Sequence, residues 1–130
     1  MTVHNRGVKP ALSADPTALH KAPTAPRYLS TYARDEWRNI MPQLIARQII
    51  TLADLAGVEN YCTCIGIVRQ IETERQASGG MIDKNSFGIL NRAAQTARQL
   101  AAEYGLTPTS RARMGNSTAM PDDDNPLSVT

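Results

Sequence analysis

The feature that most constrains the fold is a long helical pattern between Asn85 and Met114. Apolar residues recur there every three or four positions, which is the spacing of one face of an α-helix. The row consists of Phe87, Leu90, Ala94, Ala97, Ala101 and Tyr104, widened by Ala93 and Leu100. Alanine favours helix strongly, and its small side chain lets a second helix approach closely. We therefore expect a long helix here that packs tightly in a helical hairpin.

A stop and a short basic helix are expected after this row. Gly105 fits the position just past a helix end, where a positive φ costs glycine little, and Leu106 can pack back on Leu100 or Ala101. Thr107 and Pro108 fit the N-cap and the first position of a new helix. We expect that helix to end before Gly115, with two arginines near its C-terminal end, Arg111 and Arg113. Cations are favourable at a helix C-terminus, so these two do not require an external anion.

Two further helices are predicted upstream. Ser30 is a good N-cap for the first, whose apolar stripe is Ala33, Trp37, Ile40 and Leu44. Pro42 lies inside this stripe and predicts a kink or a break, because proline removes a helical hydrogen bond. Thr51 and Asp54 form a capping-box pattern that starts the second helix, with Ile50 and Leu55 placed as a hydrophobic staple. This second helix should run to about Arg75.

The second and third helices are joined by a turn at residues 79–84, and Asn85 or Ser86 is expected to cap the third. The predicted fold class is all-α: a core of two long antiparallel helices, with an N-terminal helix and a short C-terminal helix. We expect a flexible basic arm at 1–29, a helical core and oligomerisation domain at 30–114, and a disordered acidic tail at 115–130. One domain with free ends suits a chain of 130 residues.

Charge is distributed unevenly along the chain. The formal net charge is +2 overall, but it is +3 for residues 1–29, +2 for 30–113 and −3 for 115–130. A basic head and an acidic tail suggest two different partners. Cations of the arm can pair with phosphates without reading sequence. The candidate DNA-binding residues are Arg6, Lys9, Lys21, Arg27, Arg111 and Arg113; the alternative is that these charges serve solubility.

No enzymatic site is evident in the sequence. The two histidines, His4 and His20, lie in the arm, and no nucleophile, nucleotide-binding or zinc motif occurs. Cys62 and Cys64 are spaced for neither a zinc site nor a disulfide and fit a helix core. We therefore expect no catalytic residue, no metal and no cofactor. No apolar run reaches the ~20 residues of a membrane span.

Self-association is also expected. The helical body has about 85 residues, and a chain that short buries only about 60% of its surface alone. Apolar residues also lie outside the main stripes: Met41, Ile45, Tyr61, Ile67, Ile71 and Ile89. These residues fit either the hairpin core or subunit contacts, and both readings stay open.

Three stretches together resemble the small terminase subunit of tailed bacteriophages. They are L-S-x-x-A-x-x-E-W-x-x-I-x-P-x-L at 29–44, I-T-x-x-D at 50–54, and A-A-E-Y-G-L-T-P-T-S-R-A-R at 101–113. Arg6-Gly7-Val8-Lys9-Pro10 is similar to the basic start of such proteins. The chain departs at Lys84-Asn85-Ser86, where the family has Lys-Asn-Pro.

The resemblance implies an all-α protein without catalytic chemistry, which forms rings of roughly eight to eleven subunits. It would bind double-stranded viral DNA and recruit the large terminase subunit, the ATPase and nuclease that packages the genome into the procapsid. It would act in the bacterial host cytoplasm and be absent from the mature virion. The acidic residues Asp122, Asp123 and Asp124 would either dock on the large subunit or mask the basic surface.

Two other functions fit the same residues. A small helix-turn-helix-like transcription regulator would need a recognition helix with base-reading residues near its start, and the helix after Thr107 is short for this. A structural adaptor would have no use for DNA at all. A dimer in solution would favour the regulator, and a ring would favour the terminase.

Overall fold

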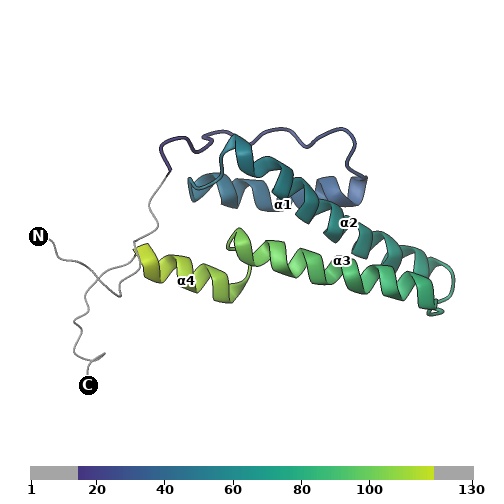
Figure 1. Ribbon diagram of the computed structural model, residues 1–130. Helices are drawn as coiled ribbons and strands as arrows, with labels where there is room; N and C mark the ends of the chain where they lie inside the picture. The colour runs from purple at the N-terminus through teal and green to yellow at the C-terminus, as the bar shows by residue number, and fades with distance from the viewer. Residues whose placement is uncertain (1–14, 119–130) are drawn as a thin grey trace, which may run out of the picture.

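A computed structural model describes residues 15–118, with side chains up to Arg113. The elements are α1 (Thr31–Ala46), the short 3₁₀ helix η1 (Leu52–Asp54), α2 (Leu55–Ala77), α3 (Lys84–Glu103) and α4 (Pro108–Thr118). Figure 1 shows α2 and α3 as a long antiparallel hairpin, with α1 against α2 and α4 continuing beyond a corner. The described residues contain no strand, and the predicted all-α class is confirmed.

The start of α1 follows the sequence prediction, but its interior does not. The Ser30 hydroxyl accepts a hydrogen bond from the amide of Ala33 at 3.1 Å, as an N-cap should. Of the predicted kink or break at Pro42, the break is wrong, because α1 is one helix from Thr31 to Ala46. Pro42 lies one turn from the helix end, and its side chain is exposed. Its missing amide costs α1 one hydrogen bond but does not end the helix.

The capping box at the start of the second helical segment is confirmed. The amide of Thr51 donates to Asp54 Oδ2 at 2.9 Å, while the Thr51 hydroxyl accepts from the amide of Ala53. The first turn is 3₁₀, and α2 follows it to Ala77, two residues past the predicted end. Gly79 and Gly80 then turn the chain with φ of 98° and 81°.

The cap of α3 differs from the prediction. Neither Asn85 nor Ser86 caps the helix; Asp83 does, accepting a hydrogen bond from the amide of Ser86 at 2.9 Å. The sequence offers three capping residues within four positions, Asp83, Asn85 and Ser86, and the helix begins after the first of them. The end of α3 is as predicted, with Gly105 at a φ of 68°.

The core lies on both sides of α2, because α1 and α3 each pack against it. Gly66 of α2 brings the backbones together: a Cβ on this glycine would lie 2.9 Å from the amide nitrogen of Ala33. Beside this crossing, the buried carboxylate of Glu36 accepts hydrogen bonds from the Tyr61 hydroxyl at 2.7 Å and from Arg69 Nη2 at 2.8 Å. Burial, followed by the bond to Glu36, raises the pKa of Tyr61.

Residues 15–29, here called the strap, lie along the helices (Figure 1). Ala18 and Leu29 are buried, and the amide of Leu19 donates to the carbonyl of Ile50 at 2.8 Å. Trp37 Nε1 donates to the carbonyl of Pro23 at 2.9 Å. Packing against the helices therefore begins within residues 15–29, inside the segment that was expected to be a flexible arm.

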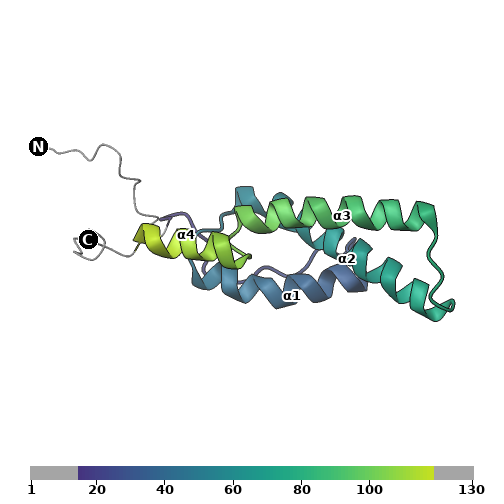
Figure 2. The ribbon, with the colours of Figure 1, turned by 90° about the horizontal axis from the view of Figure 1, so that it is seen from below.

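The outer part of the hairpin, residues 67–92, is not covered by a third helix. Both ribbon views show the tips of α2 and α3 extending beyond α1 (Figures 1 and 2). No residue of this outer hairpin is buried, although Gly66 and Ala93 on either side of it are. It nevertheless holds eight large apolar side chains: Ile67, Val68, Ile71, Met81, Ile82, Phe87, Ile89 and Leu90.

Candidate nucleic-acid interface

The corner between α3 and α4 is built from a helix stop and a helix start. The amides of Gly105 and Leu106 donate to the carbonyls of Ala102 at 3.4 Å and Ala101 at 2.8 Å, the pair of bonds of a Schellman motif. Thr107 and Ser110 then cap α4 reciprocally, each side-chain oxygen accepting from the other residue's amide at 3.1 Å. The corner is therefore fixed by local backbone bonds.

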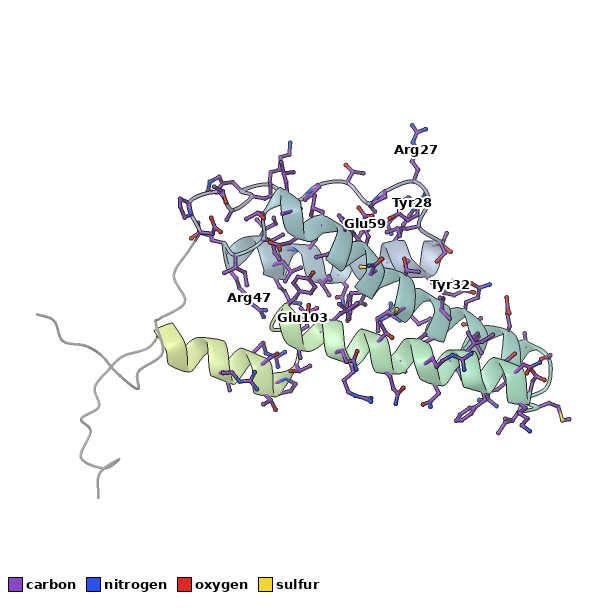
Figure 3. The ribbon with its side chains drawn as sticks, in the orientation of Figure 1. Arg27, Tyr28, Tyr32, Arg47, Glu59 and Glu103 are labelled. Atoms are coloured by element: carbon purple, nitrogen blue, oxygen red, sulfur yellow. The ribbon has the colours of Figure 1, made fainter. Side chains whose placement is uncertain are left out.

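Arg47, the residue just after α1, contacts this corner although it is distant in the sequence. Its Nη1 donates to the carbonyl oxygens of Tyr104 at 3.2 Å and Gly105 at 2.7 Å. The carbonyl of Tyr104, the C-cap of α3, is one of those that a helix C-terminus leaves without an intrahelical partner. Figure 3 shows Arg47 directed from the end of α1 toward the end of α3, where Glu103 also lies.

A second cation faces Arg47. Arg111 of α4 is exposed and donates to the carbonyl of Leu106 at 3.2 Å. Partial burial, and then the charge of Arg111, lower the pKa of Arg47. Among the residues that the structure describes, neither arginine pairs with a carboxylate. The corner thus holds two like charges together, an arrangement that a bound anion would stabilise.

The predicted position of Arg111 and Arg113 in their helix is wrong. Because α4 continues through Gly115 to Thr118, Arg111 lies in its first half and Arg113 at its middle, and neither is near its C-terminal end. The helix dipole does not favour cations there, so the sequence argument that no external anion is needed no longer holds. Arg113 is exposed on α4, two residues beyond Arg111.

Comparison with known proteins bears on the role of this corner. The family model described as "Phage terminase, small subunit" matches residues 33–120. This range covers all but the first two residues of α1, all of α2, α3 and α4, and the corner. The chain belongs to the phage terminase small-subunit family. No curated protein and no solved structure matches the chain. DNA binding and a part in genome packaging are consistent with membership of this family. The family match does not favour the alternative function, a helix-turn-helix-like transcription regulator.

The other predicted DNA contacts of this terminase small subunit do not join the corner. Lys21 and Arg27 are exposed on the strap. Arg27 lies at the start of α1, where its carbonyl accepts from Arg34, whereas Arg47 follows the end of α1 (Figure 3). Twelve residues of α1 lie between Arg34 and Arg47, so the two are about 20 Å apart along the helix axis. Arg6, Lys9 and the acidic residues Asp122, Asp123 and Asp124 lie outside the described residues.

Sequence reasoning missed Arg47 in this small subunit. It stands in a connection between two predicted helices, with no apolar period or motif around it. Its partner Gly105 is 58 positions away, so no local pattern links the two. The only available signal was negative: Arg47 lies outside both helix stripes and has no carboxylate one helical turn away to pair with.

Other site chemistry was sought among the same residues. Residues 15–113 contain no cluster of three His, Cys, Asp or Glu side chains that could hold a metal ion. Within the described helices of the small subunit, none is long and apolar enough to cross a membrane. Burial raises the pKa of the Cys62 thiol to about 12, which leaves it unreactive at neutral pH.

Proposed function

We propose that this terminase small subunit binds double-stranded viral DNA, assembles as a ring, and recruits the large terminase subunit to begin packaging. The proposed DNA contact is the corner between α3 and α4 with Arg47 and Arg111, here called the arginine corner. The observation that supports DNA binding most strongly is the pair Arg47 and Arg111, two cations held together by backbone carbonyls without a described carboxylate. Phosphate contacts of this kind give affinity that is independent of sequence. The proposed setting is the cytoplasm of the infected host.

The test is a salt titration of DNA binding. We expect Arg111→Gln to weaken binding of a duplex and to reduce the slope of log K against log salt concentration by about 1 per lost contact. Arg98→Gln, an exposed arginine on α3 away from the corner, is the matched control and should change neither. An unchanged slope for Arg111→Gln would rule out the corner as a DNA contact.

The basic residues of the N-terminal region are proposed as additional phosphate contacts. Replacing Arg6, Lys9, Lys21 and Arg27 by alanine should flatten the salt dependence further. Because Arg27 lies before the start of α1 and the corner lies beyond its end, its effect should add to that of Arg111→Gln rather than depend on it. Identical affinity and slope for the fourfold variant would exclude this region as a contact.

The outer hairpin is proposed as the subunit contact of the ring. Met81, Ile82 and Phe87 are 77%, 72% and 57% exposed, and they line a groove of about 450 Å³ together with Ile71 and Leu90. Exposed apolar patches of this kind mark association sites. The residues 67–92 carry four cations and three acids, so self-association meets no strong repulsion.

Native mass spectrometry tests the ring. Ile82→Ser with Phe87→Ser should shift the protein to smaller species, whereas Leu52→Ser, an equally exposed apolar residue on the body, should leave the assembly intact. The expected assembly has eight to eleven copies, as the resemblance to small terminases implies. An unchanged assembly in the double variant would exclude the outer hairpin as the contact. That Asp122, Asp123 and Asp124 bind the large subunit stays a prediction.

A further inference from the structure

Tyr104 is the C-cap residue of α3 and contributes to the arginine corner through its backbone. Its carbonyl oxygen accepts a hydrogen bond from Arg47 Nη1 at 3.2 Å. Its amide donates to the carbonyl of Leu100 at 3.2 Å, and the Schellman bonds of Gly105 and Leu106 follow it directly. A displacement of Tyr104 would therefore move the backbone carbonyls that hold Arg47.

The side chain of Tyr104 lies against Gly57 in the first turn of α2. A Cβ on Gly57 would overlap the Tyr104 hydroxyl oxygen and would lie 3.2 Å from Cζ of the ring. The ring packs partly buried against the core, and burial, followed by the charges of Asp54 and Glu103, raises the pKa of the hydroxyl. The phenol thus occupies the space that a side chain at Gly57 would fill, and this contact is here called the tyrosine seat.

The position of α4 depends on the end of α3. Among the described elements, only α3 comes within 8 Å of α4, measured between Cα atoms. Arg111 of α4 carries the same charge as Arg47, so the two side chains repel each other. The tyrosine seat fixes the end of α3 on α2 and thereby opposes a movement of α4 away from Arg47.

The other contacts of the corner position it less directly. The Schellman bonds run within residues 101–106 and set only the local shape of the corner. Arg47 reaches the corner through a long side chain with much rotamer freedom, so it can follow the carbonyls when they move. Tyr104 has only two side-chain torsions and is therefore the stiffer connection.

We propose that Tyr104 is a positioning residue of the DNA contact and that Gly57 is the residue that admits it. The seat holds the carbonyls of Tyr104 and Gly105 where Arg47 binds them, and it keeps Arg47 close to Arg111. Both arginines then face the same stretch of DNA backbone. This inference rests on the proposed DNA contact at the arginine corner, and it adds to that contact two residues that carry no charge.

The test fills the seat and then removes the atom that the new side chain meets. Alanine favours helix more than glycine does, so Gly57→Ala should not weaken α2 itself. The added Cβ should displace Tyr104 and weaken duplex binding about fivefold, although no charge is lost. Tyr104→Phe alone should bind as wild type does. In the double variant Gly57→Ala, Tyr104→Phe the affinity should return, because the nearest remaining ring atom lies 3.2 Å from the added Cβ.

Gly88→Ala is the matched control, because the nearest atom to its Cβ is the flexible end of Arg92 at 3.8 Å, and it should leave DNA affinity unchanged. Hydrogen exchange reports on the corner without DNA: the amides of Gly105 and Leu106 should exchange faster in Gly57→Ala and recover in the double variant. Circular dichroism checks the fold of each variant.

Two outcomes would overturn this inference alone, provided that Arg111→Gln weakens DNA binding. One is wild-type DNA affinity in Gly57→Ala. The other is a double variant that binds DNA no better than Gly57→Ala, which would show that the Tyr104 hydroxyl is not what the alanine displaces. If Arg111→Gln leaves DNA binding unchanged, the proposed contact at the corner fails, and the positioning role of Tyr104 fails with it.

Discussion

Arg47 Nη1 lies 2.7 Å from the carbonyl oxygen of Gly105, and this bond joins two residues 58 positions apart. It ties the end of α1 to the end of α3, two helices whose Cα atoms do not otherwise come within 8 Å of each other. Arg47, which completes the predicted corner, therefore lies far from the corner in the sequence and could not be inferred from the residues around Gly105. The same cation contributes to the proposed DNA contact.

Replacing Arg47 should therefore affect both stability and DNA binding. Arg47→Gln should lower the free energy of unfolding by about 1.5–3 kcal/mol, the contribution of hydrogen bonds that involve a charged group, as measured by urea denaturation at fixed protein concentration. It should also reduce the salt slope of DNA binding. Arg47→Lys keeps the charge and should keep the slope while losing part of the stability. Equal slopes for arginine and glutamine would mean that Arg47 only supports the corner.

The crossing of α1 and α2 should not tolerate a larger residue at Gly66. An added Cβ would lie 2.9 Å from the backbone nitrogen and 3.1 Å from the Cβ of Ala33. Gly66→Ala should cost about 1–3 kcal/mol, because the two helices must separate. Gly88→Ala is the control: the nearest atom is the flexible end of Arg92 at 3.8 Å, so it should stabilise α3 by about 0.5–1 kcal/mol. Thermal unfolding of both variants decides this.

The buried carboxylate of Glu36 should depend on its tyrosine partner. Tyr61→Phe removes the hydroxyl that donates to Glu36 Oε2 and leaves that oxygen buried, which should cost about 1–3 kcal/mol. Tyr28 makes the comparable bond to Glu59 at the surface and is 71% exposed. Tyr28→Phe should therefore change stability by less than about 0.5 kcal/mol. Similar losses in the two variants would contradict the role of burial.

The cap of α3 should make stability depend on acid. The backbone hydrogen bond from Ser86, followed by its side chain, lowers the pKa of Asp83 below 3.8. The stabilisation is thus fully present above pH 3.8 and is lost as pH falls through the lower folded value. Asp83→Asn can still cap the helix but does not titrate. As the pH falls through that acid range, the melting temperature of wild type should therefore fall more than that of the variant. A constant difference would show that the charge of Asp83 is not involved.

Most of the fold was predictable because its signals are local. Ser30, Thr51, Gly105 and Thr107 each act through a partner within four or five residues, and each does what its sequence position indicates. Two wrong predictions, the cap of α3 and the end of α4, also concern local features for which more than one outcome fits the sequence. Asp83, Asn85 and Ser86 can all cap a helix, and Gly115 weakens a helix without ending α4.

The candidate site was less predictable, because its geometry depends on residues that are distant in sequence. Arg111 was named from its motif, but Arg47 reaches it only through the packing of α1. The strap was read as an arm since Ala18 and Leu29 share no period, although both are buried.

The uncovered state of residues 67–92 has a consequence for how this chain can diverge. Since α1 ends its packing on α2 near Gly66, residues could be inserted or deleted in both arms of the hairpin tip without disturbing the inner core. Adding seven residues to each arm, two helical turns, would lengthen the projection by about 10 Å while keeping each side chain on nearly the same face. The distance between the exposed apolar tip and the arginine corner is therefore set by the length of this one element and can change without altering the corner.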